Sequence, residues 1–461
     1  MRCNSTEVST KQQRIATLAK RSPDMAFTSL AYMMDLDWLF EAYQQTRKNG
    51  AAGIDGVTAA EYEEDLEGNL QRLLKRAKSG SYRAPPVRRV YIPKGTSTDE
   101  VRPIGIPTLE DKILQRAVVM LLDPIYEQDF LDCSYGFRRQ RSAHQALESL
   151  WKQTMDLEGG WILEVDIRKF FDHLDHQHLR DLLQHRVNDG VLKKLINKWL
   201  KAGVMEDGNV SYPDSGSPQG GVISPLLSNV FLHYVLDVWF EEVVKPRLKG
   251  HAFLIRFADD FAIGFRLEAD ARRVMEVLPK RFAKYGLTTH PEKTRLVCFE
   301  RPSTLPDDID SDSDQGSSGT FDLLGFTHYW SKSRKGTWVV KRKTSSSRFT
   351  RAISKVAQWC RLNRHLPVST QQLKLRQKLH GHYAYFGIRG NYAALARFKY
   401  EVHRRWHQWL NRRNRQRELT WDKFNHLLKR HPLPSPRIHQ QRPTYRPPLY
   451  SKNHVLRNRM R

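Results

Sequence analysis

The stretch that decides the fold lies at residues 251–265 and reads HAFLIRFADDFAIGF. Two adjacent carboxylates stand between two apolar, aromatic-rich runs, each as long as a buried strand. This pattern predicts a β-hairpin with Asp259 and Asp260 at its turn. Two like charges held this close need a compensating cation, and phosphoryl-transfer enzymes use divalent metals with oxygen ligands. A merely solvated turn remains open on these residues alone.

A third carboxylate, Asp166, ends a predicted strand at residues 161–166 and precedes Asp259 by 93 residues. We expect one antiparallel sheet to bring the strand and the hairpin together and to cluster the three carboxylates. Two metal ions about 4 Å apart could then bridge Asp166 and Asp259, one activating a 3′-hydroxyl and the other holding a triphosphate. Exposed Lys94 and Arg102 of a predicted basic hairpin would clamp phosphate oxygens, with a solvated edge strand as the open alternative.

The charge of the chain is distributed unevenly. The 461 residues carry a net charge of +26. Residues 331–461 contain 33 Lys and Arg against 3 acids, a net charge of +30, whereas residues 1–330 contain 43 against 47, a net charge of −4. A basic C-terminal region therefore follows a near-neutral body, which favours nucleic acid as the partner. A membrane surface is the alternative, but this region is long, interleaved with aromatic residues and unlike a simple amphipathic helix.

Cysteine usage and hydropathy argue against several classes of protein. The four cysteines are far apart and form no CxxC pair, which argues against a disulfide framework and a Cys-rich zinc module and favours a reducing compartment. No run approaches the roughly 20 apolar residues of a membrane span, and no signal peptide is evident, so we expect no membrane partner. The first 23 residues are basic, and we favour a frayed or basic N-terminus over an organellar transit peptide.

Periodicity and turn residues predict mixed helices and strands along the rest of the chain. Helices are predicted at 24–50, 59–78, 108–128 and 268–284, and another is opened by the loop at 215–225. A strand is predicted within 82–94, where Val87 to Ile92 lie between prolines, and it turns at Lys94-Gly95 and returns through 101–107. Further strands are predicted at 161–166 and 295–299, with structure resuming at 321–326. The composition of residues 301–319 predicts a disordered acidic loop. Residues 345–430 are predicted to form basic helices, and the tail after Pro432 is predicted to be an extended arm.

Several ordered motifs resemble the successive blocks of a reverse transcriptase, and more narrowly the reverse transcriptase/maturase encoded in group II introns of bacteria. The central blocks are Val165-Asp166 with Phe170-Phe171-Asp172, Ser217-Pro218-Gln219-Gly220-Gly221, Phe257-Ala258-Asp259-Asp260, Gly286-Leu287 with Glu292-Lys293-Thr294, and Leu323-Leu324-Gly325-Phe326. Flanking matches begin at Asn49-Gly50, Ile92-Pro93-Lys94 and Arg102-Pro103, and recur at His380–Tyr392 and Thr420–Phe424. Two departures are Phe257, where the family more often has Tyr, and an insertion at 301–319.

The resemblance implies an α+β fold, a right-hand polymerase of fingers and palm followed by an α-helical thumb and a basic DNA-binding segment. It divides the chain into an N-terminal extension at 1–60, fingers and palm at 61–345, a thumb/maturase domain at 346–415 and a basic tail at 416–461.

The resemblance also implies roles for single residues. Two Mg²⁺ ions, with Mn²⁺ as a substitute, would be held by Asp166, Ile167, Asp259 and Asp260, of which the three aspartates are catalytic. Phe171 would reject a 2′-hydroxyl, with a core phenylalanine as the alternative. Nucleotide contacts would also come from Lys94, Arg102, Gln219 and Lys293, and the primer grip from Leu324 and Gly325.

The C-terminal third combines an apolar stripe with a basic face. Helical spacing between 392 and 417 joins Tyr392, Leu395, Phe398, Val402, Trp406, Trp409 and Leu410. The arginines expected to contact RNA or DNA are Arg389, Arg404, Arg405, Arg412, Arg413 and Arg415. We expect this basic face to lack acidic partners, so that phosphates are its natural ligands.

The implied function is an RNA-directed DNA polymerase that binds its host group II intron RNA, assists its splicing and copies it into DNA from a DNA primer and dNTPs. Without cysteines after Cys360, the chain is not expected to cut target DNA itself. The expected location is the bacterial cytoplasm or nucleoid. A splicing-only maturase and a related enzyme recruited to defence or DNA repair are the alternatives, and the oligomeric state is open.

Overall fold

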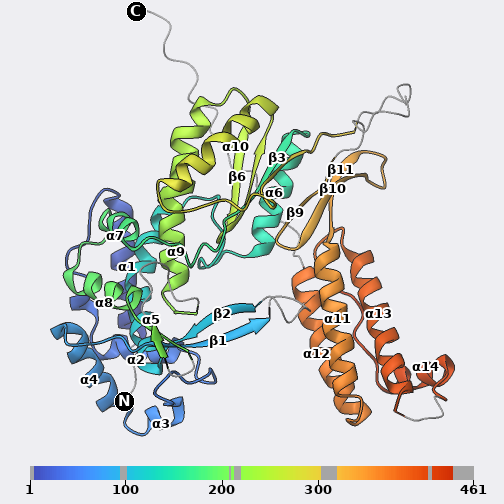
Figure 1. Cartoon of the computed structure of the whole chain (residues 1–461), viewed down its shortest axis with the longest axis horizontal. Coiled ribbons are helices and arrows are strands. Elements are labelled where there is room, and N and C mark those ends of the chain that lie inside the picture. Colours follow the sequence, from blue (N-terminus) through green and yellow to red (C-terminus); the bar gives the residue numbers. More distant parts are fainter. Residues whose placement is uncertain are drawn as a thin grey trace, which may run out of the picture. The chain divides into compact units, whose positions relative to one another are not determined.

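The computed structural model describes residues 5–93, 101–206, 209–211, 220–302, 319–413 and 418–439. Helices and sheets are mixed along the chain (Figure 1), which confirms the α+β class. The chain divides into two compact units, Met1–Arg351 and Ala352–Arg461. Three predicted site residues, Lys94, Gln219 and Arg415, lie outside the described residues, as does most of the predicted acidic loop at 301–319.

The central sheet of the first unit is antiparallel and has the strand order β6-β7-β3-β8. Its strands are β6 (Ala252–Phe257), β7 (Asp260–Phe265), β3 (Trp161–Asp166) and β8 (Arg295–Cys298). The hairpin predicted at 251–265 and the strand predicted at 161–166 are both confirmed, and they are neighbours in one sheet.

Both faces of this sheet are covered, which explains why its strands are continuously apolar rather than alternating. On one face, Leu163, Val165 and Ile263 join the larger hydrophobic cluster, and helix α10 (Glu268–Ala283) contacts β3 and β7. On the other face, residues such as Ile162 join a second cluster, and helix α6 (Ala143–Asp156) contacts β6.

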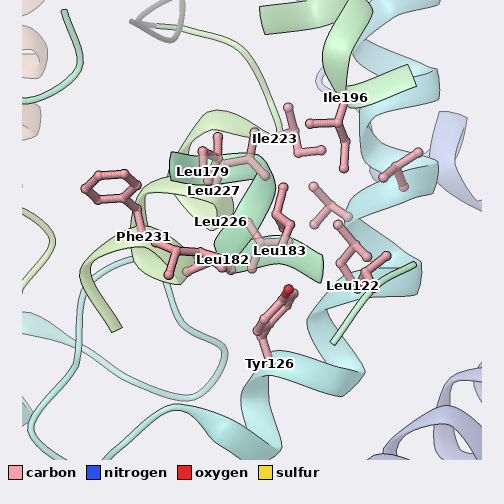
Figure 2. Packing of buried hydrophobic residues seen from close by; sticks show 14 of the residues in the cluster. Leu122, Tyr126, Leu179, Leu182, Leu183, Ile196, Ile223, Leu226, Leu227 and Phe231 are labelled. Carbon is pink, nitrogen blue, oxygen red and sulfur yellow. The ribbon is translucent and has the colours of Figure 1, made fainter. Parts of the chain in front are cut away.

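The larger cluster extends through the helices that surround α5 (Leu109–Asp129), whose predicted position at 108–128 is confirmed. Figure 2 shows Leu122 and Tyr126 of α5 facing apolar side chains of α7 (His176–Gln184), α8 (Gly190–Leu200) and α9 (Ser224–Leu232). Residues 168–173 form turns and a bend, and helix α7 follows them after its cap Asp175. Beyond α9 the helix widens into π-helical turns at His233–Asp237 and Trp239–Val244 and ends in a 3₁₀ turn at Lys245–Arg247.

The N-terminal segment corrects two predictions. Of the expected frayed or basic N-terminus, the frayed alternative is wrong from Ser5 onward, because α1 (Ser5–Arg21) packs on α5 and buries Val8, Ile15 and Ala19. The single helix expected at 24–50 is also wrong: a 3₁₀ turn at Ala31–Met33 is followed by α2 (Leu36–Gln45). The Asp35 carboxylate accepts the amide of Trp38 at 3.0 Å, so it caps α2 and separates it from the turn.

A similar cap divides the helix predicted at 59–78 into α3 (Ala59–Glu63) and α4 (Leu66–Ser79). The Asp65 carboxylate accepts the amide of Gly68 at 3.2 Å and starts the second helix.

Two smaller sheets complete the first unit. The predicted basic hairpin is confirmed as β1 (Val87–Pro93) and β2 (Val101–Ile106), which extend through β4 (Val204–Glu206) and β5 (Asn209–Ser211) in the order β2-β1-β4-β5. The third sheet consists of β9 (Phe321–Leu323), β10 (Phe326–Lys332) and β11 (Trp338–Thr344).

The second unit is helical, as the sequence predicts for residues 345–430. Helix α11 (Ser346–Leu362) crosses the boundary and is followed by α12 (Val368–Phe386), α13 (Tyr392–Asn411) and α14 (Trp421–Arg430). The predicted apolar stripe of α13 is buried at Leu395, Phe398, Val402, Trp406 and Leu410. Tyr392 is 55% exposed, so its assignment to the stripe is wrong.

Candidate functional site

The strand register brings two of the predicted carboxylates together. Asp166, the last residue of β3, pairs directly with Asp260, the first residue of β7. Residues paired across an antiparallel ladder point to the same face, with Cβ atoms roughly 5 Å apart. Asp259 lies in the two-residue turn that joins β6 to β7. One end of the sheet therefore carries all three acidic side chains.

The turn itself has an unusual backbone. Ala258 has a φ of 58°, in the left-handed region that residues with a Cβ adopt at a cost. Gly136 lies against it, since a Cβ on Gly136 would come within 2.3 Å of the Ala258 amide nitrogen. The segment before Gly136 is bonded to β6: the Arg256 amide donates to the Cys133 carbonyl at 2.8 Å, and the Tyr135 amide donates to the Arg256 carbonyl at 2.9 Å. Tertiary contacts thus hold the strained turn.

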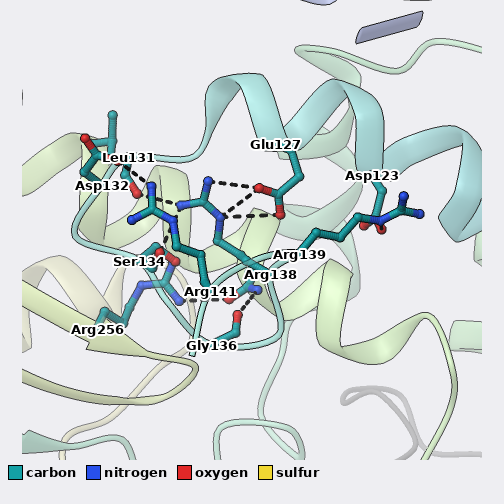
Figure 3. A network of polar contacts seen from close by, with 11 residues as sticks. Asp123, Glu127, Leu131, Asp132, Ser134, Gly136, Arg138, Arg139, Arg141 and Arg256 are labelled. Atoms are coloured by element: carbon teal, nitrogen blue, oxygen red, sulfur yellow. Dashed lines mark hydrogen bonds and ion pairs between the residues drawn. The ribbon is translucent and has the colours of Figure 1, made fainter. Parts of the chain in front are cut away.

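A fully buried arginine supports the same turn. The Arg256 guanidinium forms an ion pair with Asp237, with both side chains 0% exposed, and its Nε donates to Asp237 Oδ1 at 2.7 Å. It also donates to the carbonyl oxygen of Ala258 at 3.0 Å, to Asn229 Oδ1 at 3.0 Å and to Ser134 Oγ at 2.7 Å. The guanidinium therefore ties the turn to a helical segment and to the loop before Gly136, and Figure 3 shows its place beside Ser134.

Burial and mutual repulsion oppose the ionisation of the acids in the turn. Partial burial raises the pKa of Asp259, and the charge of Asp166 adds to the effect. Burial, as the largest cause, and the negative charge of Asp259, as the second, raise the pKa of Asp260 to about 6. Asp260 is exposed to solvent. A cation bound there would lower both raised pKa values.

Asp166 has a cationic neighbour. The Lys293 ammonium lies 2.9 Å from Asp166 Oδ2, and both side chains are substantially exposed. The amide of His290 donates to the Asp166 carbonyl at 2.8 Å, which fixes the segment carrying Lys293 beside β3. Lys293 therefore lies at the carboxylates themselves, and its predicted role toward a nucleotide stays a prediction.

The residues at this end of the sheet suit a hard divalent cation. Three carboxylates and the main-chain carbonyl of Ile167 are oxygen donors of the kind that Mg²⁺ prefers. Ile167 forms a β-bridge with Thr289. In this bridge the Arg168 amide donates to the Thr288 carbonyl and the His290 amide donates to the Asp166 carbonyl, so the Ile167 carbonyl is not used. Within the described ranges, however, no three acidic, His or Cys side chains converge closely enough to form a metal cage. The oxygen donors thus fit a divalent cation in kind.

The two phenylalanines after β3 differ in burial. Phe170 is 2% exposed and belongs to the core, which confirms that one of the pair is a core residue. Phe171 is half-buried and meets Phe170 edge-on, with ring centroids 5.4 Å apart. Arg102 on β2 is exposed, and its positive charge acts against the upward shift in the pKa of Asp259. The roles of Phe171 and Arg102 stay predictions.

The predicted primer-grip residues form the turn between β9 and β10. Leu324 and Gly325 have φ values of 52° and 80°, the pair of positive angles found in tight hairpin turns. The Leu324 amide donates to the Asp260 carboxylate. The third sheet is thereby linked directly to the acidic end of the central sheet.

The basic face of the second unit differs from the expectation. Arg404 pairs with Glu401 at 3.2 Å and Arg405 lies 4.0 Å from the same carboxylate, so the prediction that this face lacks acidic partners is wrong for both. Arg413 donates to the carbonyls of Arg364 and Leu366, and Arg412 lies over the Trp409 ring at 4.8 Å. Arg389 is exposed, and it also interacts with a neighbouring group of the protein.

The supporting residues Arg256, Asp237 and Asn229 are missing from the sequence prediction. A signal for Arg256 exists, because a single arginine inside an apolar buried strand requires a partner. Sequence alone does not identify that partner, since Asp237 belongs to a helical segment and meets Arg256 only through the fold.

The acidic end of the central sheet lies within a part of the chain that matches a known protein family. Residues 92–328 match the family described as reverse transcriptase (RNA-dependent DNA polymerase), so the chain is a member of the reverse transcriptase family. The match runs from the predicted basic hairpin into β10 and includes all three aspartates.

The nearer relatives narrow this class. Protein YkfC of Escherichia coli is 39% identical over 49% of this chain and 61% of its own length. The group II intron-encoded protein LtrA of Lactococcus lactis is 39% identical over 48% of this chain and 37% of its own. Nuclear intron maturase 1 of Arabidopsis thaliana is 28% identical over 23% of this chain and 15% of its own. The predicted resemblance to group II intron reverse transcriptase/maturases is confirmed, although the matches cover only part of each relative.

In the part of the chain that the structure describes, no helix is both long and apolar enough to cross a membrane.

Proposed function

We propose that this chain is an RNA-directed DNA polymerase that binds a host group II intron RNA, assists its splicing and copies it into DNA from a primer at the target site. The observation that carries the proposal is the pairing of Asp166 with Asp260, with Asp259 in the adjoining turn, in a member of the reverse transcriptase family. Nucleotidyl transfer needs negative charge gathered where divalent cations and a triphosphate meet.

Asp166, Asp259, Asp260 and the Ile167 carbonyl would hold two Mg²⁺ ions, with Mn²⁺ as a substitute. Bound there, the ions would neutralise charge on the primer oxygen and on the triphosphate. Lys293, whose ammonium lies 2.9 Å from Asp166 Oδ2, would add positive charge beside these ions. Arg102 on β2, with Lys94 beyond the end of β1, would bind phosphate oxygens.

Other residues would select and position the substrates. Phe171 would pack against the sugar of the incoming nucleotide, and its half-buried ring, braced by Phe170, is suited to exclude a 2′-hydroxyl. Gln219 would contact the nucleotide or the template backbone. The Leu324-Gly325 turn would grip the primer, supported by the hydrogen bond from Leu324 to Asp260.

In this proposal the first unit supplies fingers and palm, and the second supplies the thumb/maturase domain and a basic DNA-binding tail. The net charge of +30 in residues 331–461 supports contact with RNA and DNA phosphates there. Arg404 and Arg405 would contribute less than expected, because Glu401 offsets their charge. The proposed location is the bacterial cytoplasm or nucleoid.

We further propose that the chain does not cleave DNA and takes its primer from a strand end made otherwise. The absence of any closely spaced cysteine pair supports this, since a Cys-rich nuclease module would need one. Incubation of the full chain with supercoiled DNA and Mg²⁺ should leave the DNA intact, and nicking would contradict the proposal.

The polymerase proposal is tested by primer extension on an RNA template with dNTPs and Mg²⁺. The full chain should synthesise complementary DNA, and EDTA should abolish the synthesis. Failure to make DNA on several RNA templates, while the chain still binds structured intron RNA and promotes its splicing, would favour a splicing-only maturase.

A further inference from the structure

Beside the acidic turn, a loop presents an aromatic ring to solvent. Phe137 is 60% exposed and has a φ of 57°, a left-handed conformation that is rare for a bulky residue. Its ring centroid lies 6.5 Å from that of Phe257, the last residue before the turn. Folding gains little from an exposed aromatic ring, and the backbone strain adds a cost. An exposed ring held in a strained conformation therefore indicates a role in binding a ligand.

Contacts of the residues on both sides of Phe137 hold the loop in place. Gly136 lies against the Ala258 amide, and the Gly136 carbonyl accepts the Asn229 side-chain amide at 2.6 Å. On the other side of Phe137, buried Arg138 pairs with Glu127 at 3.0 Å and donates to the carbonyls of Leu131 and Ser134 (Figure 3). Tertiary contacts therefore hold both neighbours of Phe137, and its ring lies beside Phe257, which precedes the acidic turn.

We propose that Phe137 stacks on the terminal base of the primer strand, the strand that the acidic centre extends. This inference rests on the proposed polymerase function and goes beyond it. Aromatic rings bind the flat face of any base, which suits an enzyme that must accept every sequence. A hydrophobic contact with protein would instead call for a broader apolar patch.

The strand order indicates the primer rather than the incoming nucleotide. Phe137 lies beside Phe257 on β6, whereas Phe171 follows β3, and β7 separates the two strands. Phe137 is thus next to the strand on one side of β7, and Phe171 follows the strand on the other side of β7. If Phe171 meets the incoming sugar, the group that must approach from the other side is the primer end.

A polar groove next to the loop can take the neighbouring phosphates. It has a volume of about 560 Å³, and its lining includes Arg138, Arg139, Arg141 and Lys152. Arg139 pairs with Asp123 and Arg141 pairs with Asp132, and in each pair one side chain is exposed and the other is partly buried. Ion pairs that solvent reaches contribute little, so an arginine of this groove can turn toward a phosphate.

The test compares Phe137→Ala, Phe137→Leu and Phe137→Trp in the full chain with 2-aminopurine as the primer 3′-terminal base. Equilibrium binding is followed without dNTPs, so it does not depend on catalysis. Phe137→Ala should weaken primer–template binding roughly 10- to 100-fold, in line with the loss of one base-stacking contact. Phe137→Leu should stay weak because it lacks a flat ring, and Phe137→Trp should bind about as well as wild type.

Tyr32, which is 65% exposed in the N-terminal segment, provides the matched control. Tyr32→Ala should leave both binding and 2-aminopurine fluorescence unchanged. Unchanged primer affinity in Phe137→Ala, or a response only from 2-aminopurine in the template, would overturn the proposal. A raised KM for dNTPs with normal primer binding would also overturn it. If wild type binds primer–template but makes no DNA, the polymerase function fails instead.

Discussion

Replacing Arg256 with methionine should destabilise the first unit more than any substitution of a surface ion pair. The change removes the partner of Asp237 while both side chains are 0% exposed. Breaking a buried pair from one side typically costs about 3–5 kcal/mol, because one charge is left buried without compensation. The Ala258 carbonyl and the Ser134 hydroxyl also lose a donor. We therefore expect the free energy of unfolding to fall by about 3–5 kcal/mol at neutral pH.

The size of this loss should depend on pH. Burial already raises the pKa of Asp237, and loss of the guanidinium removes the charge that opposes the shift. With a raised pKa, the folded variant holds a proton that the unfolded chain has released. Its stability should therefore fall as the pH rises from the ordinary Asp range toward the raised pKa. The gap between Arg256→Met and wild type should be smaller at pH 5 than at pH 8.

Urea unfolding provides the assay, with hydrogen exchange of peptides from 252–265 to locate the change. Arg272→Ala is the control, since its pair with Glu268 is exposed and should contribute less than about 1 kcal/mol. A double variant, Arg256→Met with Asp237→Leu, should recover most of the stability because no charge remains buried. It should not recover polymerase activity if the Ala258 contact positions the turn. A loss below about 1 kcal/mol in Arg256→Met would refute the reasoning.

Three further predictions concern the acidic end of the sheet. In EDTA, the Asp260→Asn variant should melt at a higher temperature than wild type above pH 6 but not near pH 4. The reason is that the folded protein loses stability as a carboxylate with a raised pKa ionises between these values. Equal melting curves at pH 7.5 would contradict this prediction. Lys293→Ala should bind Mg²⁺ more tightly in calorimetry, because it removes a cation that competes for Asp166, with little effect on stability since the pair is exposed; weaker binding would mean that Lys293 does not compete. Phe171→Ala should incorporate ribonucleotides, measured as the ratio of kcat/KM for rNTP to that for dNTP, and an unchanged ratio would remove Phe171 from sugar selection.

The central sheet could be predicted because its strands are buried on both faces. Continuous apolar runs at 161–166 and 251–265 leave few alternatives to core strands, and the carboxylates at their ends then meet at one edge. Helix α5 was equally predictable, because its apolar side chains recur at helical spacing. These features depend on local pattern and on burial, which sequence reports directly.

Features that depend on long-range contacts could not be predicted. Helix α1 has a weakly apolar sequence and is stabilised by packing on α5. Ala258 adopts a positive φ because Gly136 and Arg256 hold it there, and its own residue type gives no such signal. The exposed ring of Phe137 likewise has meaning only through its place beside Phe257.

The central claim is that Asp166, Asp259 and Asp260 form one polymerase centre. Single-turnover DNA synthesis on an RNA template with Mg²⁺ tests it most directly, with wild type compared with Asp166→Asn and Asp259→Asn. Primer–template affinity and folding are measured alongside. We predict that each variant binds primer–template normally and extends it at least about 100-fold more slowly, as expected when charge stabilisation in a transition state is lost. Extension at wild-type rates by either folded variant would contradict the claim.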